Sequence, residues 1–337
     1  MPCQFRKKCQ ERCSAGQYSE GVLARVQSRT KEKYRKTLLP LLVHIEEHLD
    51  EDLSLKALAA LAGFSPHHFH RVFQHVTGET PKEYVRRLRL ERAVYRLKVS
   101  PDNVLDIALE AGFQTHESFT RAFTQHFAMS PSDLRNSLRT YRACIDETLG
   151  TYTFAGFSLE SPVQLRQDNH HEPISIEQTA PRQLIFRRCT GPYEALLAEN
   201  EEFAELWAPL FAFAEAQGLA VDETELIGIC HDDPYVADPE KVRFDACLAV
   251  AEPVRASHPI GSRILQGGLN VVRRHAAGFE EIAKTFAFIG VEWLPTEDYL
   301  LRAAPPFEVY RCQRIQGRLE RLYTDSYVPL EPVKAPL

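Results

Sequence analysis

The chain has 337 residues, of which 44% are hydrophobic and 26% charged, a balance typical of folded globular proteins that excludes a disordered or fibrous chain. Its apolar stretches, such as residues 38–43, fall far short of the roughly 18 residues that a membrane-spanning helix needs, and residues 1–30 lack the apolar core of a signal peptide. We therefore expect a cytoplasmic protein without a membrane partner, in which the eight dispersed cysteines are reduced thiols.

Charge divides the chain into two unequal parts. Residues 1–142 carry 23 Lys and Arg against 16 Asp and Glu, a net charge of +7, and residues 143–337 carry 17 against 30, a net charge of −13. A basic part joined to an acidic part indicates that the first meets a polyanion and the second does not. Charge alone leaves open the alternative of two unrelated domains.

The first 36 residues are basic and contain few apolar side chains, so we expect them to form a disordered arm. Cys3, Cys9 and Cys13 lie in this arm at spacings unlike those of zinc knuckles. The role of these three cysteines stays open.

Residues 55–76 predict a helix-turn-helix unit. A short helix over residues 55–62 ends at Gly63, after which Ser65 and Pro66 supply the N-cap and the first turn of a second helix. The apolar stripe of that second helix consists of Phe69, Val72, Phe73 and Val76. Another face carries long hydrogen-bonding side chains, namely His67, His70, Arg71 and Gln74. In helix-turn-helix proteins the second helix lies in the major groove of DNA, so we interpret this face as the reading face.

The same pattern returns 50 residues later. Phe119 and Phe123 repeat the stripe of the first unit, and the turn after Gly112 is one residue longer than the turn after Gly63. The second reading face is predicted to consist of His116, Glu117, Thr120 and Arg121. Residues 81–98 favour a connecting helix of about 25 Å, which can hold two recognition helices roughly one turn of B-DNA apart, about 34 Å.

The histidines of the first unit could instead be metal ligands, because some of His67, His68, His70 and His75 share a helix face. No cysteine or carboxylate flanks them in the way that zinc sites usually require. DNA reading or plain solvation is the favoured interpretation, and we expect neither a metal site nor a cofactor.

The doubled pattern is carried by a specific set of residues: Gly63-Phe64-Ser65, Phe69, Arg71, Phe73, Gly78 and Pro81, then Ile107-Ala108, Gly112-Phe113, Phe119, Arg121, Phe123 and Ser130-Pro131. In these residues, region 37–142 resembles the AraC/XylS family of bacterial transcription regulators. The resemblance implies a seven-helix domain that inserts two recognition helices into successive major grooves of double-stranded promoter DNA, with RNA polymerase as a further partner. One departure is Ala128, where the family commonly has a glycine that matches Gly78.

The acidic part predicts an α+β domain with an internal repeat. Residues 143–172 are polar and predict a linker, and a strand over residues 173–179 follows. Two βαββ cycles are then predicted, with strands at 183–189, 226–230, 243–250, 269–275, 307–312 and 322–328 and helices at 193–217 and 279–291. Related by a pseudo-two-fold axis, the two units would leave a cleft between them. The predicted fold class is therefore multidomain, an all-α double helix-turn-helix domain followed by an α+β domain of two βαββ repeats.

A further set of motifs runs through the second part: Gly191-Pro192-Tyr193, then residues 231–234, 239–241, 243–247, 292–295, 307–310 and 328–330. In these motifs residues 173–331 are similar to the GyrI-like small-molecule-binding domain. The resemblance implies a cleft for a small amphipathic, cationic or aromatic effector, with a buried glutamate among aromatic side chains. At the matching positions these residues are Glu308, Tyr193, Trp293 and Tyr310. The alternative is that the rings are ordinary core residues and that Glu308 lies on a strand edge.

The catalytic motifs GxSxG, HExxH and GxxxxGK are missing from the sequence. We therefore assign no catalytic residues and interpret the chain as a non-enzymatic transcription regulator, associated with the nucleoid when bound to DNA. Two alternatives remain for the GyrI-like part. It could hydrolyse an electrophilic toxin with Glu308 and a tyrosine, as some GyrI-like proteins do, or it could sequester a protein.

Overall fold

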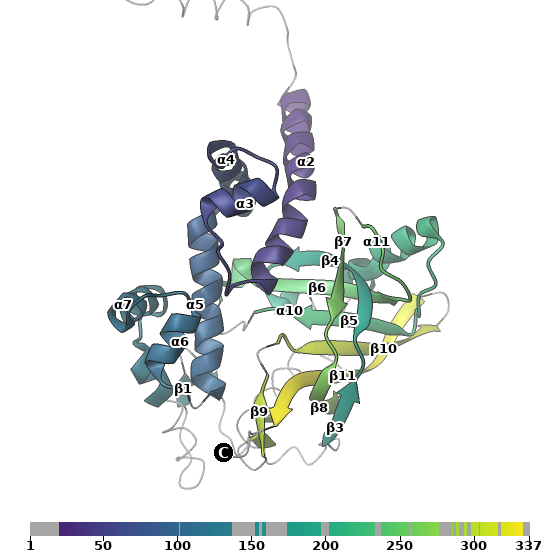
Figure 1. Cartoon of the computed structure of the whole chain (residues 1–337). Helices are drawn as coiled ribbons and strands as arrows, with labels where there is room; N and C mark the ends of the chain where they lie inside the picture. The colour runs from purple at the N-terminus through teal and green to yellow at the C-terminus, as the bar shows by residue number, and fades with distance from the viewer. Residues whose placement is uncertain are drawn as a thin grey trace, which may run out of the picture. The chain divides into compact units, whose positions relative to one another are not determined.

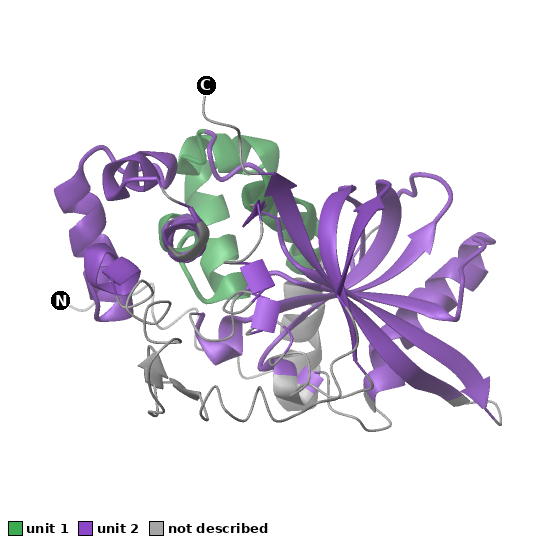
Figure 2. Cartoon of the chain, turned by 90° about the horizontal axis from the view of Figure 1, so that it is seen from below, with its two compact units in different colours: residues 1–47, 52–84 green, residues 48–51, 85–337 purple. Residues whose placement is uncertain are grey.

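The chain forms two compact units, residues 1–47 with 52–84 and residues 48–51 with 85–337 (Figure 2). The division falls inside one helix, α5 (Pro81–Val99), rather than at the change from basic to acidic sequence. A computed structural model describes residues 20–100, 102–136, 152–154, 157–159, 174–196, 202–232, 237–256, 258–275, 285, 288–289, 293–294, 298–302, 304–315 and 318–332.

The first unit contains the first helix-turn-helix. Its helices are α2 (Glu20–Glu47), α3 (Leu55–Leu61) and α4 (Pro66–Thr77), labelled in Figure 1. Ser54 and Ser65 begin α3 and α4 by accepting backbone N–H groups with their hydroxyls, which satisfies donors that have no partner within the helix. Both α2 and α3 contact α4, where Phe69 and Phe73 are completely buried.

The prediction of a disordered arm over residues 1–36 is wrong from residue 20 onward, because α2 begins at Glu20. Good helix formers such as Lys, Glu and Leu dominate its second half, and Leu38, Leu41 and Ile45 are buried there. Burial of one apolar face stabilises a helix more than composition alone suggests. Cys3, Cys9, Cys13 and Cys144 lie outside the described residues.

The remaining helices of the all-α region repeat this design. They are α5, α6 (Val104–Glu110) and α7 (His116–Phe127), and residues 131–136 are also helical. Thr80 and Glu83 begin α5 as a capping box, in which the Glu83 carboxylate accepts the Thr80 N–H and the Thr80 hydroxyl accepts the Glu83 N–H. Asn103 and Thr115 cap α6 and α7. Within the described part, the seven helical segments confirm the predicted all-α region.

A nine-stranded antiparallel sheet forms most of the rest of the second unit. Its strands are β3 (Ile174–Thr179), β4 (Arg182–Thr190), β5 (Glu225–Cys230), β6 (Arg243–Val250), β7 (Ile260–Leu265), β8 (Gly268–His275), β9 (Tyr299–Leu301), β10 (Phe307–Ile315) and β11 (Arg318–Pro332). The order is β3-β8-β11-β10-β5-β6-β4-β7, with β9 paired to β11. The cycle β4-β5-β6 therefore mirrors β8-β10-β11 about the central pair of β5 and β10, as the predicted repeat requires.

Several elements differ from the sequence prediction. The helix expected over residues 193–217 consists of α10 (Tyr193–Leu196) and α11 (Glu202–Gln217), and residues 197–201 between them lie outside the described part. Most of the helix expected at 279–291 also lies outside it. Two short strands, β1 (Tyr152–Phe154) and β2 (Phe157–Leu159), pair within the expected linker. The edge strand β7 was not predicted, because Gly261, Ser262 and Arg263 interrupt its apolar residues, and its pairing with β4 defines it.

Candidate nucleic-acid interface and buried carboxylate site

The helix α4 separates a buried face from an exposed one. The buried face consists of Phe69, Val72 and Phe73. The other face carries the four residues predicted to read DNA, exposed except for a half-buried histidine at position 70: His67, His70, Arg71 and Gln74. Side chains of these types can donate hydrogen bonds to base edges or to phosphates.

The helix α7 repeats this division. Its buried face consists of Phe119, Ala122 and Phe123. His116, Glu117 and Arg121 are exposed, whereas Thr120 is half-buried and its hydroxyl has no hydrogen-bond partner within the described part. The backbone amide of Glu117 and the Thr115 hydroxyl hold the pKa of the Glu117 carboxyl below its usual range. Glu117 therefore helps to begin α7, which is a structural role that sequence reasoning did not assign to it.

Arginines of α5 are engaged inside the protein. Arg89 donates to the Leu49 carbonyl at 2.9 Å and to the Glu51 carbonyl at 3.1 Å. Arg96 forms an ion pair with Asp102 at 2.7 Å. The guanidinium groups of Arg89 and Arg96 therefore make hydrogen bonds within the protein in this structure rather than being left for DNA phosphates.

Two carboxylates of the sheet are completely buried, and their surroundings are opposite in character. Asp245 on β6 is paired with three basic side chains: it accepts from Arg188 and Arg263, and its carboxylate lies 2.7 Å from the His231 ring nitrogen. Burial would raise the pKa of Asp245, but the charges of Arg188 and His231 hold it well below its usual range. Asp245 is thus a satisfied structural anion.

Glu308 on β10 has no such partners. Its Oε2 accepts a hydrogen bond from the Tyr310 hydroxyl, and its Oε1 has no hydrogen-bond partner within the described part. Burial raises the pKa of Glu308 to about 7, against the lowering effects of the Tyr310 hydroxyl and the Arg321 charge. A buried carboxyl oxygen without a partner costs free energy, so this group differs from an ordinary core residue.

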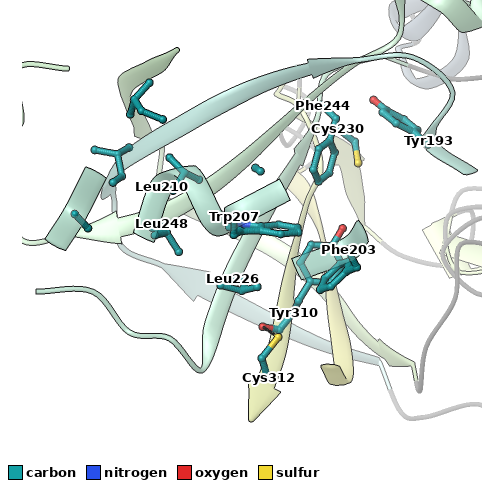
Figure 3. Packing of buried hydrophobic residues seen from close by; sticks show 14 of the residues in the cluster. Tyr193, Phe203, Trp207, Leu210, Leu226, Cys230, Phe244, Leu248, Tyr310 and Cys312 are labelled. Atoms are coloured by element: carbon teal, nitrogen blue, oxygen red, sulfur yellow. Dashed lines mark hydrogen bonds between the residues drawn. The ribbon is translucent and has the colours of Figure 1, made fainter. Parts of the chain in front are cut away.

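Aromatic rings surround the Tyr310 side chain. The ring centroids of Phe203 and Trp207, both on α11, lie 5.1 and 5.5 Å from that of Tyr310 in edge-to-face geometry. Figure 3 shows these three rings together in the core between α11 and the sheet. A Cβ on Gly228, which pairs with Glu308, would lie 2.6 Å from the Phe244 ring, so only glycine fits there. We call Glu308, Tyr310, Phe203 and Trp207 the carboxylate-aromatic cluster.

Polar side chains continue from this cluster across the sheet. Ser326 lies opposite Glu308, and Thr324 lies opposite Tyr310, so both share the face of the cluster. The Ser326 hydroxyl is 3.0 Å from the His275 ring nitrogen, whereas the buried Thr324 hydroxyl has no partner within the described part. The middle of the sheet therefore buries more hydrogen-bonding capacity than its own groups satisfy.

The structure brings three of the four predicted ligand residues into one region and separates the fourth. Tyr193 is buried in the same core as Tyr310, and its hydroxyl donates to the Arg243 carbonyl at 2.9 Å. Trp293 stacks instead on Tyr299, at 6.4 Å between ring centroids, beside a separate core cluster. The tryptophan beside Tyr310, which hydrogen-bonds to Glu308, is Trp207.

Family comparisons agree with this architecture. Residues 58–137 match a helix-turn-helix domain family, and residues 172–331 match the GyrI-like small molecule binding domain. The transcriptional regulator Rob of Salmonella typhimurium is 33% identical over 235 residues, which cover 68% of this chain and 74% of Rob. This chain belongs to the AraC/XylS family of DNA-binding transcription regulators.

Two more relatives match shorter stretches of this AraC/XylS regulator. The right origin-binding protein of Escherichia coli K12 is 42% identical over 141 residues, which cover 41% of this chain and 44% of that protein. The regulatory protein SoxS of Escherichia coli K12 is 32% identical over 105 residues, which cover 31% of this chain and 98% of SoxS. Nearly the full length of SoxS is thus matched by less than a third of this chain.

Sequence reasoning missed three side chains around Tyr310 in this regulator: Phe203, Trp207 and Arg321. The apolar spacing of α11 could have placed both rings on its buried face, but no local signal brings that face to β10. Arg321 carries no signal at all, because its position depends on how β11 pairs with β10.

The described residues do not meet the requirements of a metal site, a disulfide or a membrane-spanning helix. Among the described residues, no group of three or more His, Cys, Asp or Glu side chains is arranged to hold a metal ion. The four described cysteines, Cys189, Cys230, Cys247 and Cys312, are free thiols. None of the helices in the described ranges has the length and apolarity to span a membrane.

Proposed function

We propose that this regulator binds specific promoter DNA through the exposed faces of α4 and α7 and that its GyrI-like domain senses an amphipathic, cationic aromatic effector. RNA polymerase is the partner through which such a regulator would act on transcription. The DNA-reading faces are supported by their matched exposure and by the relationship to Rob and SoxS. The sensing function is supported above all by Glu308, a buried carboxyl group with an unmatched oxygen among aromatic rings.

Physical chemistry explains why such a site would select a cation. Inside the sheet an ionised carboxylate whose oxygen lacks a hydrogen-bonded cation is unfavourable, and a cationic ligand would supply a directly paired positive charge. Ring faces carry negative charge density, and each ring contact with a cation is worth roughly 0.5–2 kcal/mol. The ligand thus needs both a positive charge for Glu308 and an apolar body for Phe203, Trp207 and Tyr310.

Alanine substitutions test the DNA-reading faces. If Arg71 and Arg121 contact bases, Arg71→Ala or Arg121→Ala should weaken specific binding by about 1–3 kcal/mol. Fluorescence anisotropy with promoter fragments selected by the protein measures this, and Lys241→Ala, a change in the acidic domain, serves as a control. Unchanged affinity in both variants, with normal helical content, would contradict the assignment.

A matched ligand pair tests the sensing function. Benzyltrimethylammonium and neopentylbenzene have the same shape, but only the first is charged. Glu308→Gln keeps the shape of the side chain and removes its charge. We therefore expect this variant to bind the cation clearly more weakly and to bind the neutral compound with unchanged affinity. Equal loss of both ligands would make Glu308 structural, and no binding of the cation by the wild type would contradict the sensing function.

The raised pKa of Glu308 predicts the direction of the pH dependence. With a pKa of about 7, Glu308 is largely protonated at pH 6, and a cation must then displace that proton. Cation affinity should therefore be about tenfold lower at about pH 6 than at about pH 8, and the neutral compound should show no such change. Calorimetric titrations of the wild type and of Glu308→Gln measure this dependence, which the variant should lose.

A further inference from the structure

A β-bulge turns an arginine towards the carboxylate-aromatic cluster. Arg311 on β10 pairs with Tyr323, but the next residue, Cys312, pairs with Arg321, so Leu322 is the extra residue on β11. Because side chains alternate along a strand, a regular β11 would place Arg321 on the same face as Tyr323, opposite to the cluster. The bulge instead leaves Leu322 48% exposed and brings Arg321 to the face of Tyr310.

Arg321 lies over two rings of the carboxylate-aromatic cluster. Its guanidinium carbon is 4.9 Å from the ring centroid of Phe203 and 5.7 Å from that of Tyr310. Its charge also acts on Glu308, since it lowers the pKa of that carboxyl against the effect of burial. The same rings and the same carboxyl that support the sensing function thus already interact with a positive charge of the protein itself.

We propose that Arg321 is an internal cation that a cationic effector displaces from the rings of Phe203 and Tyr310. This inference rests on the proposed sensing function and adds the residue that sets its selectivity. A guanidinium group is planar and weakly hydrated, so it is a strong competitor for ring faces. Small, strongly hydrated cations cannot replace it, and an effector must offer a larger apolar body together with its charge.

Arg321→Met is the informative variant, because methionine keeps an unbranched apolar stem over Phe203 and removes the charge. The full-length protein is titrated at about pH 8.5, where Glu308 is ionised, with benzyltrimethylammonium and with neopentylbenzene. We expect Arg321→Met to bind the cation about tenfold more tightly than the wild type, because the competing ring contact is gone. The neutral compound should gain much less, since it uses no charge.

Arg274→Met is the matched control. The Arg274 guanidinium carbon also lies over a ring, 4.1 Å from the Tyr323 centroid, and it pairs with Asp325 at 2.7 Å, but both partners belong to the opposite face of the sheet. This variant should leave the affinity for both ligands unchanged. A gain in Arg274→Met equal to that in Arg321→Met would overturn the proposal, because a general change in charge would then explain both.

The remaining outcomes separate this inference from the sensing function. Unchanged or weaker cation binding by folded Arg321→Met, with Glu308→Gln still losing the cation, overturns the displacement of Arg321 alone. Failure of the wild type and of Arg321→Met to bind the cation overturns both proposals. If Arg321→Met does not fold, Arg321→Lys replaces it: lysine keeps the charge and lacks the planar group, so a gain of about threefold is expected. No gain in that variant overturns the proposal.

Discussion

The two helix-turn-helix units bury the same ring pair and differ at their turns. Phe69 and Phe73 in the first unit and Phe119 and Phe123 in the second are completely buried, and each pair has a centroid distance of 5.4 Å. The recognition helices also begin 50 residues apart, at Pro66 and His116. Core packing therefore imposes the same geometry on both units.

The turns show where the second helix-turn-helix is more constrained than the first. Gly63 and Gly112 both adopt a left-handed conformation, with φ of 70° and 74°. A Cβ on Gly63 would meet nothing within 4 Å, whereas one on Gly112 would lie 2.7 Å from Arg89. The recognition helices end at Gly78 in the first unit and at Ala128 in the second, again both left-handed, with φ of 79° and 55°. Alanine is strained in that conformation, so the second helix-turn-helix carries a cost in backbone free energy that the first avoids.

Removal of a buried ring should have the largest effect on stability, and the loss should be equal in the two helix-turn-helix units. Phe73→Ala and Phe123→Ala each remove a fully buried ring, and each should lower the free energy of unfolding by about 3–5 kcal/mol. Urea unfolding of the full chain, followed by helical circular dichroism, measures the loss. Leu61→Ala, at a side chain that is 62% exposed, should change little. Clearly different losses for the two phenylalanines would break the equivalence of the cores.

Alanine at the two turn glycines should separate the units. Gly63→Ala should cost about 1–2 kcal/mol from backbone strain alone. Gly112→Ala should cost about 1.5–3 kcal/mol more, because Arg89 must give up its hydrogen bonds to the Leu49 and Glu51 carbonyls. A double-mutant cycle with Arg89→Met checks the cause, since the extra cost should disappear in that background. Equal costs at both glycines in the wild-type background would show that Arg89 moves aside freely.

The helix ends should respond in opposite directions. Ala128→Gly should raise the free energy of unfolding by about 1 kcal/mol by relieving the left-handed alanine, and Gly78→Ala should lower it by a similar amount. Shifts in melting temperature of the full chain are sufficient to measure this pair. A loss of stability in Ala128→Gly would mean that the alanine methyl group makes contacts that outweigh its strain.

Local sequence pattern was sufficient to predict many of the helices and strands of this protein. Apolar residues at helical spacing, glycine after the first helix and a hydroxyl N-cap before the second determine both helix-turn-helix units, because each signal acts within a few residues of its effect. Alternating and apolar runs located most strands of the two βαββ cycles in the same way. Glu308 and Tyr310 were assigned to one sheet face, since residues two apart on a strand share a face.

Tertiary structure alone decided which side chains lie around Glu308 and Tyr310. Trp207 rather than Trp293 lies beside Tyr310, because contacts between α11 and the sheet bring the two together across a long stretch of chain. Arg321 reaches the same rings only because the register of β11 against β10 shifts at Leu322. The face of a strand residue depends on pairing with a strand elsewhere in the sequence, and a shift of one residue reverses it. Strand identity is therefore a local property of this sequence, whereas the composition of its buried site is a property of the whole sheet.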